Sequence, residues 1–193
     1  MQLHVVIAST RPNRIGPAIA RWFHGFAQEH GAFAAHLVDL ADFDLPIFDE
    51  PQHPALGNYA HAHTRRWAES VRSADAFVFV TPEYNFGPPP SLLNALNFVY
   101  LEWNYAPVGF VSYGGVSGGA RATQALRSTV SALKMVAMAE GVAIPMAASQ
   151  IADGAFAAND LNHMAAKAML NEMARWTGAL AGLRADRKPG AAD

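Results

Sequence analysis

The 193-residue chain contains no cysteine, and this absence excludes several kinds of chemistry at once. Disulfide bonds, thiolate nucleophiles, cysteine-ligated zinc sites and iron–sulfur clusters all require that side chain. A protein without cysteine fits a reducing cytoplasm, so a cytoplasmic location is expected here without being required.

The chain also lacks an excess of basic charge and any long hydrophobic run. It has 14 Lys and Arg against 16 Asp and Glu, a formal net charge of −2. No basic stripe is visible, so we expect no nucleic-acid partner. No apolar run is long enough to span a bilayer and no signal-peptide pattern is present, so we expect no membrane partner.

Short hydrophobic runs are abundant instead. Hydrophobic residues make up 51% of the chain and charged residues 16%, which suits one domain, residues 1–193, with a sizeable core. Continuous apolar runs of this kind are typical of parallel strands that are buried on both faces. The expected strands are Leu3–Ala8, Ala35–Leu40, Ala76–Thr81, Val108–Ser112 and Val142–Met146.

Helical patterns separate these runs. A first helix has an apolar face that begins at Ile15 and is expected to stop at Gly31. Further helices are expected at about Tyr59–Ser73, Ser91–Trp103, Gly119–Glu140 and Asp160–Leu183, and a frayed polar tail at 184–193. This alternation predicts a doubly wound α/β fold, a five-stranded parallel sheet in the flavodoxin-like order 2-1-3-4-5 with helices on both faces.

The first strand-to-helix loop, "STRPNRIG" (Ser9–Gly16), combines two hydroxyls with two guanidinium groups. It lies at the carboxyl edge of the sheet and opens a helix, whose free N–H groups and dipole favour an anion. Ser9 and Thr10 can donate hydrogen bonds to a phosphate, and Arg11 and Arg14 can neutralise it. Alternatively, one hydroxyl caps the helix and the arginines are solvated.

Two common nucleotide-binding motifs are missing after the first strand. Neither G-x-x-x-x-G-K-[ST] nor G-x-G-x-x-G is present, which disfavours ATP and a dinucleotide held in the Rossmann manner. A phosphate on this loop therefore favours a mononucleotide.

The loop after the third strand, "TPEYNFGPPPSLLNAL" (Thr81–Leu96), is stiffened by four prolines. Tyr84 and Phe86 supply aromatic surface, Asn85 supplies an amide, and Ser91 can cap the next helix. The stretch could also be a rigid turn with core aromatics.

The loop after the fourth strand, "SYGGVSGGAR" (Ser112–Arg121), has glycines at 114, 115, 118 and 119. These glycines allow the backbone to approach a flat ligand closely, or they provide flexibility alone. Taken together, the three loops predict a phosphate on the first and a flat, polar-edged ring between the second and third, the shape of flavin mononucleotide (FMN).

The stretches "ASTRPNR", "TPEYNFGPPPSLLNAL" and "SYGGVSGGARA" resemble, in this order, motifs of the NADPH-dependent FMN reductase family, which includes azo-, quinone- and chromate-reducing members. The resemblance runs through almost the whole chain. It implies an FMN-containing oxidoreductase in which NADPH or NADH passes a hydride to the flavin, which then reduces a small acceptor such as a quinone, an azo compound or free flavin. It also implies a homodimer, or a dimer of dimers, with the flavin near the interface.

The resemblance assigns no catalytic side chain and no metal, because the flavin carries the chemistry. The residues expected to bind the cofactor are Ser9, Thr10, Arg11, Arg14, Ile15, Gly16, Pro82, Glu83, Tyr84, Asn85, Phe86, Ser112, Tyr113, Gly114 and Gly115.

Two positions depart from the family pattern. Ala8 stands where a glycine is usual and could disturb the phosphate loop, leaving a nucleotide-binding fold without its flavin. Leu93 stands where a lysine is frequent, which removes a positive charge near the ring and could alter the choice of acceptor.

Other interpretations remain open. A flavodoxin-like electron carrier or redox sensor would not turn over with NAD(P)H, and a carrier is expected to be strongly acidic, which this chain is not. His53, His61 and His63 are weak candidates for a metal site, because residues two apart on a helix diverge. The helix Ser91–Trp103 is apolar nearly all round, which predicts a dimer interface on its second side.

Overall fold

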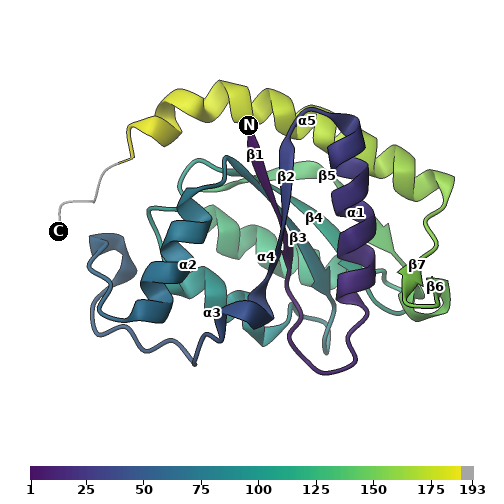
Figure 1. Ribbon diagram of the computed structural model, residues 1–193, viewed down its shortest axis with the longest axis horizontal. Helices are drawn as coiled ribbons and strands as arrows, with labels where there is room; N and C mark the ends of the chain where they lie inside the picture. Colours follow the sequence, from purple (N-terminus) through teal and green to yellow (C-terminus); the bar gives the residue numbers. More distant parts are fainter. Residues whose placement is uncertain (188–193) are drawn as a thin grey trace.

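The computed structural model describes residues 1–187 and shows a five-stranded parallel sheet in the order β2-β1-β3-β4-β5. The predicted flavodoxin-like order is confirmed (Figure 1). The strands are β1 (Gln2–Ile7), β2 (Ala34–Asp39), β3 (Ala76–Pro82), β4 (Pro107–Tyr113) and β5 (Val136–Ile144), and a short antiparallel pair, β6 (Ile151–Ala152) and β7 (Ala155–Phe156), follows.

Within the described part of the chain, five α-helices cover the two faces of the sheet. They are α1 (Gly16–His30), α2 (Ala62–Arg72), α3 (Pro90–Phe98), α4 (Ala120–Ala132) and α5 (Asp160–Ala185). Short 3-10 turns form at Leu40–Phe43, Pro54–Leu56 and Ala147–Gln150. None of these helices is long and apolar enough to cross a bilayer, a finding that applies to residues 1–187.

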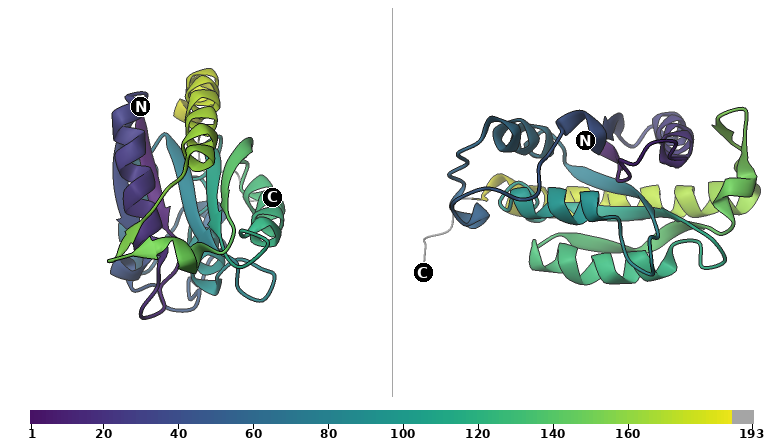
Figure 2. Two further views of the ribbon diagram at one scale, coloured as in Figure 1. Left: turned by 90° about the vertical axis from the view of Figure 1, so that its right-hand side faces the viewer. Right: turned by 90° about the horizontal axis from the view of Figure 1, so that it is seen from below.

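The two apolar cores lie on opposite faces of the sheet. Helices α1 and α5 pack on one face, through residues such as Phe23 and Met169. Helices α2, α3 and α4 pack on the other, through Trp67, Leu96 and Leu126. Figure 2 shows α1 and α4 on opposite flanks of the sheet. Burial on both faces is the physical reason for the continuous apolar runs of β1, β3 and β4.

The predicted helix Ser91–Trp103 is too long, because α3 ends at Phe98 and Val99 is extended, with φ −135° and ψ 157°. The chain turns so that Trp103 packs edge-on against Phe77 and Trp67, with ring centroids 4.9 Å and 5.8 Å apart. Burying this indole offsets the loss of one more helical turn.

The predicted boundary between the fourth helix and the last strand is also wrong. Helix α4 ends at Ala132, Lys134 adopts a left-handed conformation, and β5 begins at Val136 rather than Val142. The segment is rich in helix formers, but it pairs with β4 from Pro107 onward, and these ladder hydrogen bonds override local propensity.

Helix α5 extends two residues beyond the predicted Leu183, so the expected frayed tail is wrong for its first residues. Arg184 is buried and donates hydrogen bonds to the carbonyl oxygens of Ala74 and Asn104, which anchors the end of the helix. The rest of the expected tail, 188–193, lies outside the described residues.

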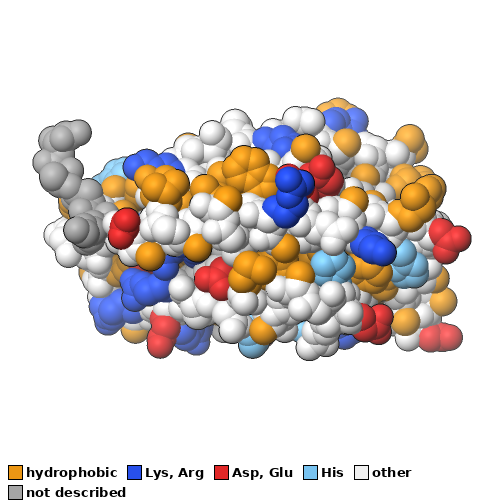
Figure 3. All heavy atoms as spheres, turned by 90° about the horizontal axis from the view of Figure 1, so that it is seen from above, with side chains coloured by type: hydrophobic (Ala, Val, Ile, Leu, Met, Phe, Trp, Pro, Cys, Tyr) orange, Lys and Arg blue, Asp and Glu red, His pale blue; other side chains and the backbone are white. Residues whose placement is uncertain are grey.

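The surface on the side of α5 carries exposed hydrophobic side chains among charged side chains of both signs (Figure 3).

Candidate functional site

Four loops at the carboxyl ends of the strands enclose a cleft of about 400 Å³. The loop after β1 contributes Arg11, Arg14 and Ile15, and the loop after β3 contributes Glu83 and Tyr84. The loop after β4 contributes Gly114 and Gly115, and the fourth loop follows β5. The complete lining is Arg11, Arg14, Ile15, Pro82, Glu83, Tyr84, Tyr113, Gly114, Gly115, Met146, Ala147, Ala148 and Ser149. The parallel sheet thus brings together residues that are more than a hundred positions apart.

Several expected ligands do not line this cleft. Ser9 and Ser112 are buried, and Gly16 is packed beneath the first loop. Thr10 instead lines a neighbouring groove, and Asn85 and Phe86 lie outside the cleft lining. Cofactor binding by the predicted set as a whole stays a prediction.

The N-terminus of α1 has no side-chain cap. Its N-cap residue is Ile15, and neither Ser9 nor Thr10 accepts a hydrogen bond from the first turn. The purely capping role considered for these hydroxyls is therefore wrong. Pro17 has no N–H, and Ala18 and Ile19 donate to the carbonyl oxygen of Ile15, so of the first four helical residues Gly16 alone has an N–H without a partner in residues 1–187.

Gly16 is required by packing. A Cβ atom there would lie 2.6 Å from both Ser9 Oγ and the Tyr113 hydroxyl oxygen. The Tyr113 hydroxyl donates to Ser9 Oγ over 3.2 Å, and burial raises the pKa of Tyr113 to about 12, so the phenol stays protonated at neutral pH. The close approach of these groups brings the end of β4 against the phosphate loop.

The two arginines of the first loop differ in their surroundings. Arg14 donates to both carboxylate oxygens of Asp39, over 2.8 Å and 2.5 Å, and to the carbonyl oxygen of Ser9. Arg11 is exposed, and its side chain makes no hydrogen bond or ion pair with residues 1–187. Arg14 therefore shapes the loop from the end of β2, while Arg11 is the free cation at the cleft.

The loop after β3 contains a tight turn from Tyr84 to Gly87, closed by N–H to carbonyl hydrogen bonds of 2.8 Å and 2.9 Å. Asn85 and Phe86 within it are left-handed, with φ 48° and 67°. Ser91 does not cap α3 as expected, because its hydroxyl donates to the carbonyl oxygen of Ala8 over 2.5 Å. This contact ties the second loop to the end of β1.

The two departures from the family pattern leave the cleft intact. Ala8 is fully buried within the core on the α3 side and does not line the cleft. Leu93 lines a separate groove of about 690 Å³ between α3 and the loop after β2, which Thr10 also lines. The loss of a charge at position 93 thus changes that groove rather than the cleft wall.

The first glycine pair offers one free backbone donor. Gly114 donates its N–H to the carbonyl oxygen of Ile144 over 3.3 Å, so this group is already engaged. The N–H of Gly115 has no partner among residues 1–187, and a Cβ atom built there would meet nothing within 4 Å. Gly115 thus lines the cleft with an N–H group that is unpaired within residues 1–187.

The sequence analysis missed the fourth wall of the cleft, Met146–Ser149. Its backbone N–H groups hold the glycine loop, because Met146 donates to Gly115 and Ala147 to Gly114, over 2.9 Å and 3.1 Å. Loops that follow parallel strands lie at this edge of the sheet, so the segment after the last strand could have been expected here. The expected strand ran to Met146, two residues beyond the observed end of β5 at Ile144, and so included the start of this wall.

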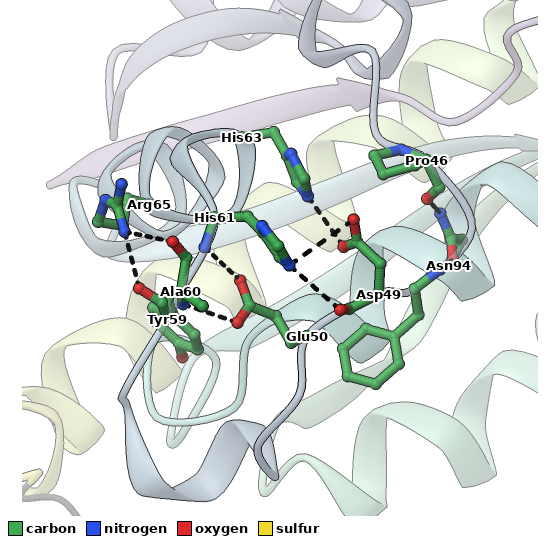
Figure 4. Close-up of polar contacts among 10 residues, drawn as sticks. Pro46, Asp49, Glu50, Tyr59, Ala60, His61, His63, Arg65 and Asn94 are labelled. Carbon is green, nitrogen blue, oxygen red and sulfur yellow. Dashed lines mark hydrogen bonds and ion pairs between the residues drawn. The ribbon is translucent and has the colours of Figure 1, made fainter.

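His61 and His63 do not diverge, contrary to expectation, because His61 precedes α2 in an extended conformation. Their rings stack with centroids 5.2 Å apart and both face Asp49 (Figure 4). Glu50 accepts hydrogen bonds from the backbone at the start of α2, and Asn94 of α3 binds the same segment through Pro46 and Phe48. These contacts fasten the long loop before α2. Among residues 1–187, no group of three or more His, Cys, Asp or Glu side chains could hold a metal ion.

Residues 1–149, more than half of the chain, match the NADPH-dependent FMN reductase family. The chain belongs to that family. An NAD(P)H-dependent FMN reductase of Schizosaccharomyces pombe is 43% identical over 133 residues, which cover 68% of this chain and 66% of that protein. A quinone reductase of Pseudomonas putida is 28% identical over 178 residues, covering 89% and 92% of the two chains.

The fold of this family member also matches solved structures. The flavoenzyme NAD(P)H:(acceptor) oxidoreductase FerB from Paracoccus denitrificans has a TM-score of 0.72 at 22% identity, over 92% of this chain and 97% of that one. The predicted family, the oxidoreductase function and the use of FMN with NAD(P)H are confirmed by the family match.

Proposed function

We propose that this reductase holds FMN in the cleft and uses it to pass hydride from NADPH or NADH to a small acceptor, such as a quinone, an azo compound or free flavin. FMN supplies the redox chemistry when bound, and the protein supplies binding, orientation and electrostatics. One observation carries the proposal: within residues 1–187, the cleft combines an unpaired cation, Arg11, with an unpaired N–H group at Gly115, beside the uncapped N-terminus of α1.

The residues fit this cofactor in distinct ways. Arg11 and the N–H of Gly16 at the start of α1 would bind the phosphate, while Arg14 and Asp39 hold the loop in shape. The N–H of Gly115 would offer a hydrogen bond to the ring edge of a bound flavin and so stabilise negative charge there. The protonated Tyr113 hydroxyl donates to Ser9 Oγ, so the Ser9 hydroxyl can still donate its own proton to another acceptor.

The sequence offers no second dinucleotide motif, so both substrates are expected to use the one cleft in turn. We therefore expect a two-step shuttle, with NAD(P)H leaving before the acceptor enters. Initial rates measured over both substrates should give parallel double-reciprocal lines. Intersecting lines would indicate a ternary complex and contradict the shared site.

The competing hypothesis, a flavodoxin-like carrier or sensor, is tested by the same preparation. Steady-state oxidation of NADPH with a quinone is expected of the reductase and not of a carrier. A visible absorption spectrum of the purified protein tests the cofactor directly, since bound FMN is yellow. The near-neutral net charge of −2 also disfavours a carrier that docks through acidic surface.

We also propose a homodimer, or a dimer of dimers, that forms at the groove beside α3 rather than on a second apolar side of that helix. Leu92, Leu96 and Phe98 are buried in the protein's own core. The outward side of α3 lines the groove of about 690 Å³ through Pro90, Leu93, Asn94 and Asn97, opposite Ile47, which is 90% exposed. A second subunit that filled this groove would cover the exposed apolar surface.

The use of NAD(P)H favours the cytoplasm as the location.

A further inference from the structure

Glu83 belongs to the cleft lining, but its carboxylate is already engaged. The side chain is 6% exposed. It accepts hydrogen bonds from the backbone N–H of Arg121 over 3.0 Å and from Arg121 Nε over 2.7 Å. A carboxylate occupied in this way is poorly placed to act on a ligand as a base.

The acceptor position of Glu83 has a second consequence for α4. This helix begins at Ala120, and its own N-cap residue, Gly119, has no side chain to cap it. Glu83 therefore supplies, from a different loop, the negative charge and the acceptor that the first turn of α4 lacks. Hydrogen bonds from Arg121 and Ser117 and the charge of Arg121 hold the pKa of Glu83 below its usual value, although burial alone would raise it.

Arg121 contacts the second loop at another point. Its guanidinium carbon lies 3.8 Å from the centroid of the Phe86 ring. Phe86 is in the left-handed region at the second central position of the tight turn, where glycine is usually favoured, and the residue is 70% exposed. The planar guanidinium thus covers a side chain that the turn would not otherwise favour.

We propose that Glu83 and Arg121 are positioning residues, which clamp the Tyr84–Gly87 turn to the start of α4 and so fix the wall beside which the FMN ring binds. The effect on FMN rests on the proposed function. The clamp itself does not, because Arg121 contacts both Glu83 and Phe86 without any ligand.

Amide hydrogen exchange in the flavin-free protein tests the clamp. The amides of Tyr84 and Gly87, which bond to each other's carbonyl oxygens, should exchange faster in Arg121→Ala and in Glu83→Gln. The matched control is Arg127→Ala, which removes another arginine of α4 that contacts the carbonyl oxygen of Met138 instead. Unchanged exchange in both clamp variants would overturn the proposal.

Flavin titration then tests the consequence for the site. Each clamp variant should bind FMN and riboflavin more weakly by the same factor, about tenfold, which corresponds to about 1.4 kcal/mol. The double variant should lose no more than either single one, because both substitutions open the same contact. Arg121→Lys should restore little, since lysine lacks the planar fork.

Three outcomes would overturn this role. Loss of FMN binding alone would place Arg121 at the phosphate. Unchanged affinity with a large fall in the rate of flavin reduction would give Glu83 a direct part in the reaction. A lower melting temperature with unchanged affinity and exchange would leave only a structural role. If the wild-type protein binds no flavin while the exchange result holds, the proposed function and the effect on FMN fail and the clamp stands.

Discussion

Replacing Arg11 by alanine tests the phosphate site most directly. Arg11 is exposed at the cleft and unpaired within residues 1–187, whereas the charge of Arg14 is balanced by Asp39 at 2.5 Å. Arg11 should therefore carry most of the side-chain charge that the phosphate meets. A hydrogen bond to a charged group contributes about 1.5–3 kcal/mol, and each ~1.4 kcal/mol is a factor of ten in affinity.

Arg11→Ala should accordingly weaken FMN by roughly ten- to a hundredfold. Riboflavin has the same ring and no phosphate, so its affinity should be unchanged. The loss should shrink at high salt, because exposed charges are screened. The assay is titration of flavin-free wild type and variant with both ligands, followed by fluorescence.

Arg21→Ala is the matched control, because Arg21 is an exposed arginine of α1 whose guanidinium reaches the carbonyl oxygen of Gly154 rather than the cleft. It should leave both affinities unchanged. Equal losses of FMN and riboflavin in Arg11→Ala would mean that Arg11 supports the fold or the ring. No loss for either ligand would refute the phosphate site.

Three further predictions concern packing, pH and assembly. Gly16→Ala should destabilise the protein by about 1–3 kcal/mol in urea unfolding and lower its affinity for FMN, because the added Cβ meets the buried hydroxyls of Ser9 and Tyr113. Gly25→Ala on the same helix is the control and should not destabilise the protein, because a Cβ there meets nothing within 4 Å. Burial and neighbouring His36 lower the pKa of His4 to about 4, so the folded state binds fewer protons and stability falls as pH drops below about 6.5. Between pH 7 and pH 5 this loss should be about 2 kcal/mol, and it should be absent in His4→Gln. Light scattering should give a multiple of the 20.7 kDa chain mass, with Ile47→Asp in the groove beside α3 shifting it toward one chain; a wild-type monomer would contradict the dimer.

Much of the fold could be predicted from hydrophobic pattern alone. The runs Val5–Ala8 and Phe77–Val80 predicted buried parallel strands, because only a strand covered on both faces tolerates apolar residues at every position. Chain order then placed their following loops at one edge of the sheet. That is why Arg11, Tyr84 and Gly115 could be assigned to one site before their distances were known.

The errors fall where local preference competes with distant contacts. The segment Met135–Glu140 has the composition of a helix, but pairing with β4 makes most of it a strand, and no local pattern reports that pairing. Trp103 has helical spacing from Leu96, but the chain leaves the helix to bury its indole against Phe77.

Only the tertiary structure decided which site residues are free and which are engaged. The sequence by itself determined the fold class, the family and the loops at which the cofactor is expected, because burial periodicity and motifs are local properties. Arg14 and Asp39 are 25 positions apart, and Glu83 and Arg121 are 38 apart. Such pairs form because parallel pairing brings the ends of β1 and β2, and of β3 and β4, side by side. Hydrogen-bond partners and charge balance across that edge are properties of the assembled sheet.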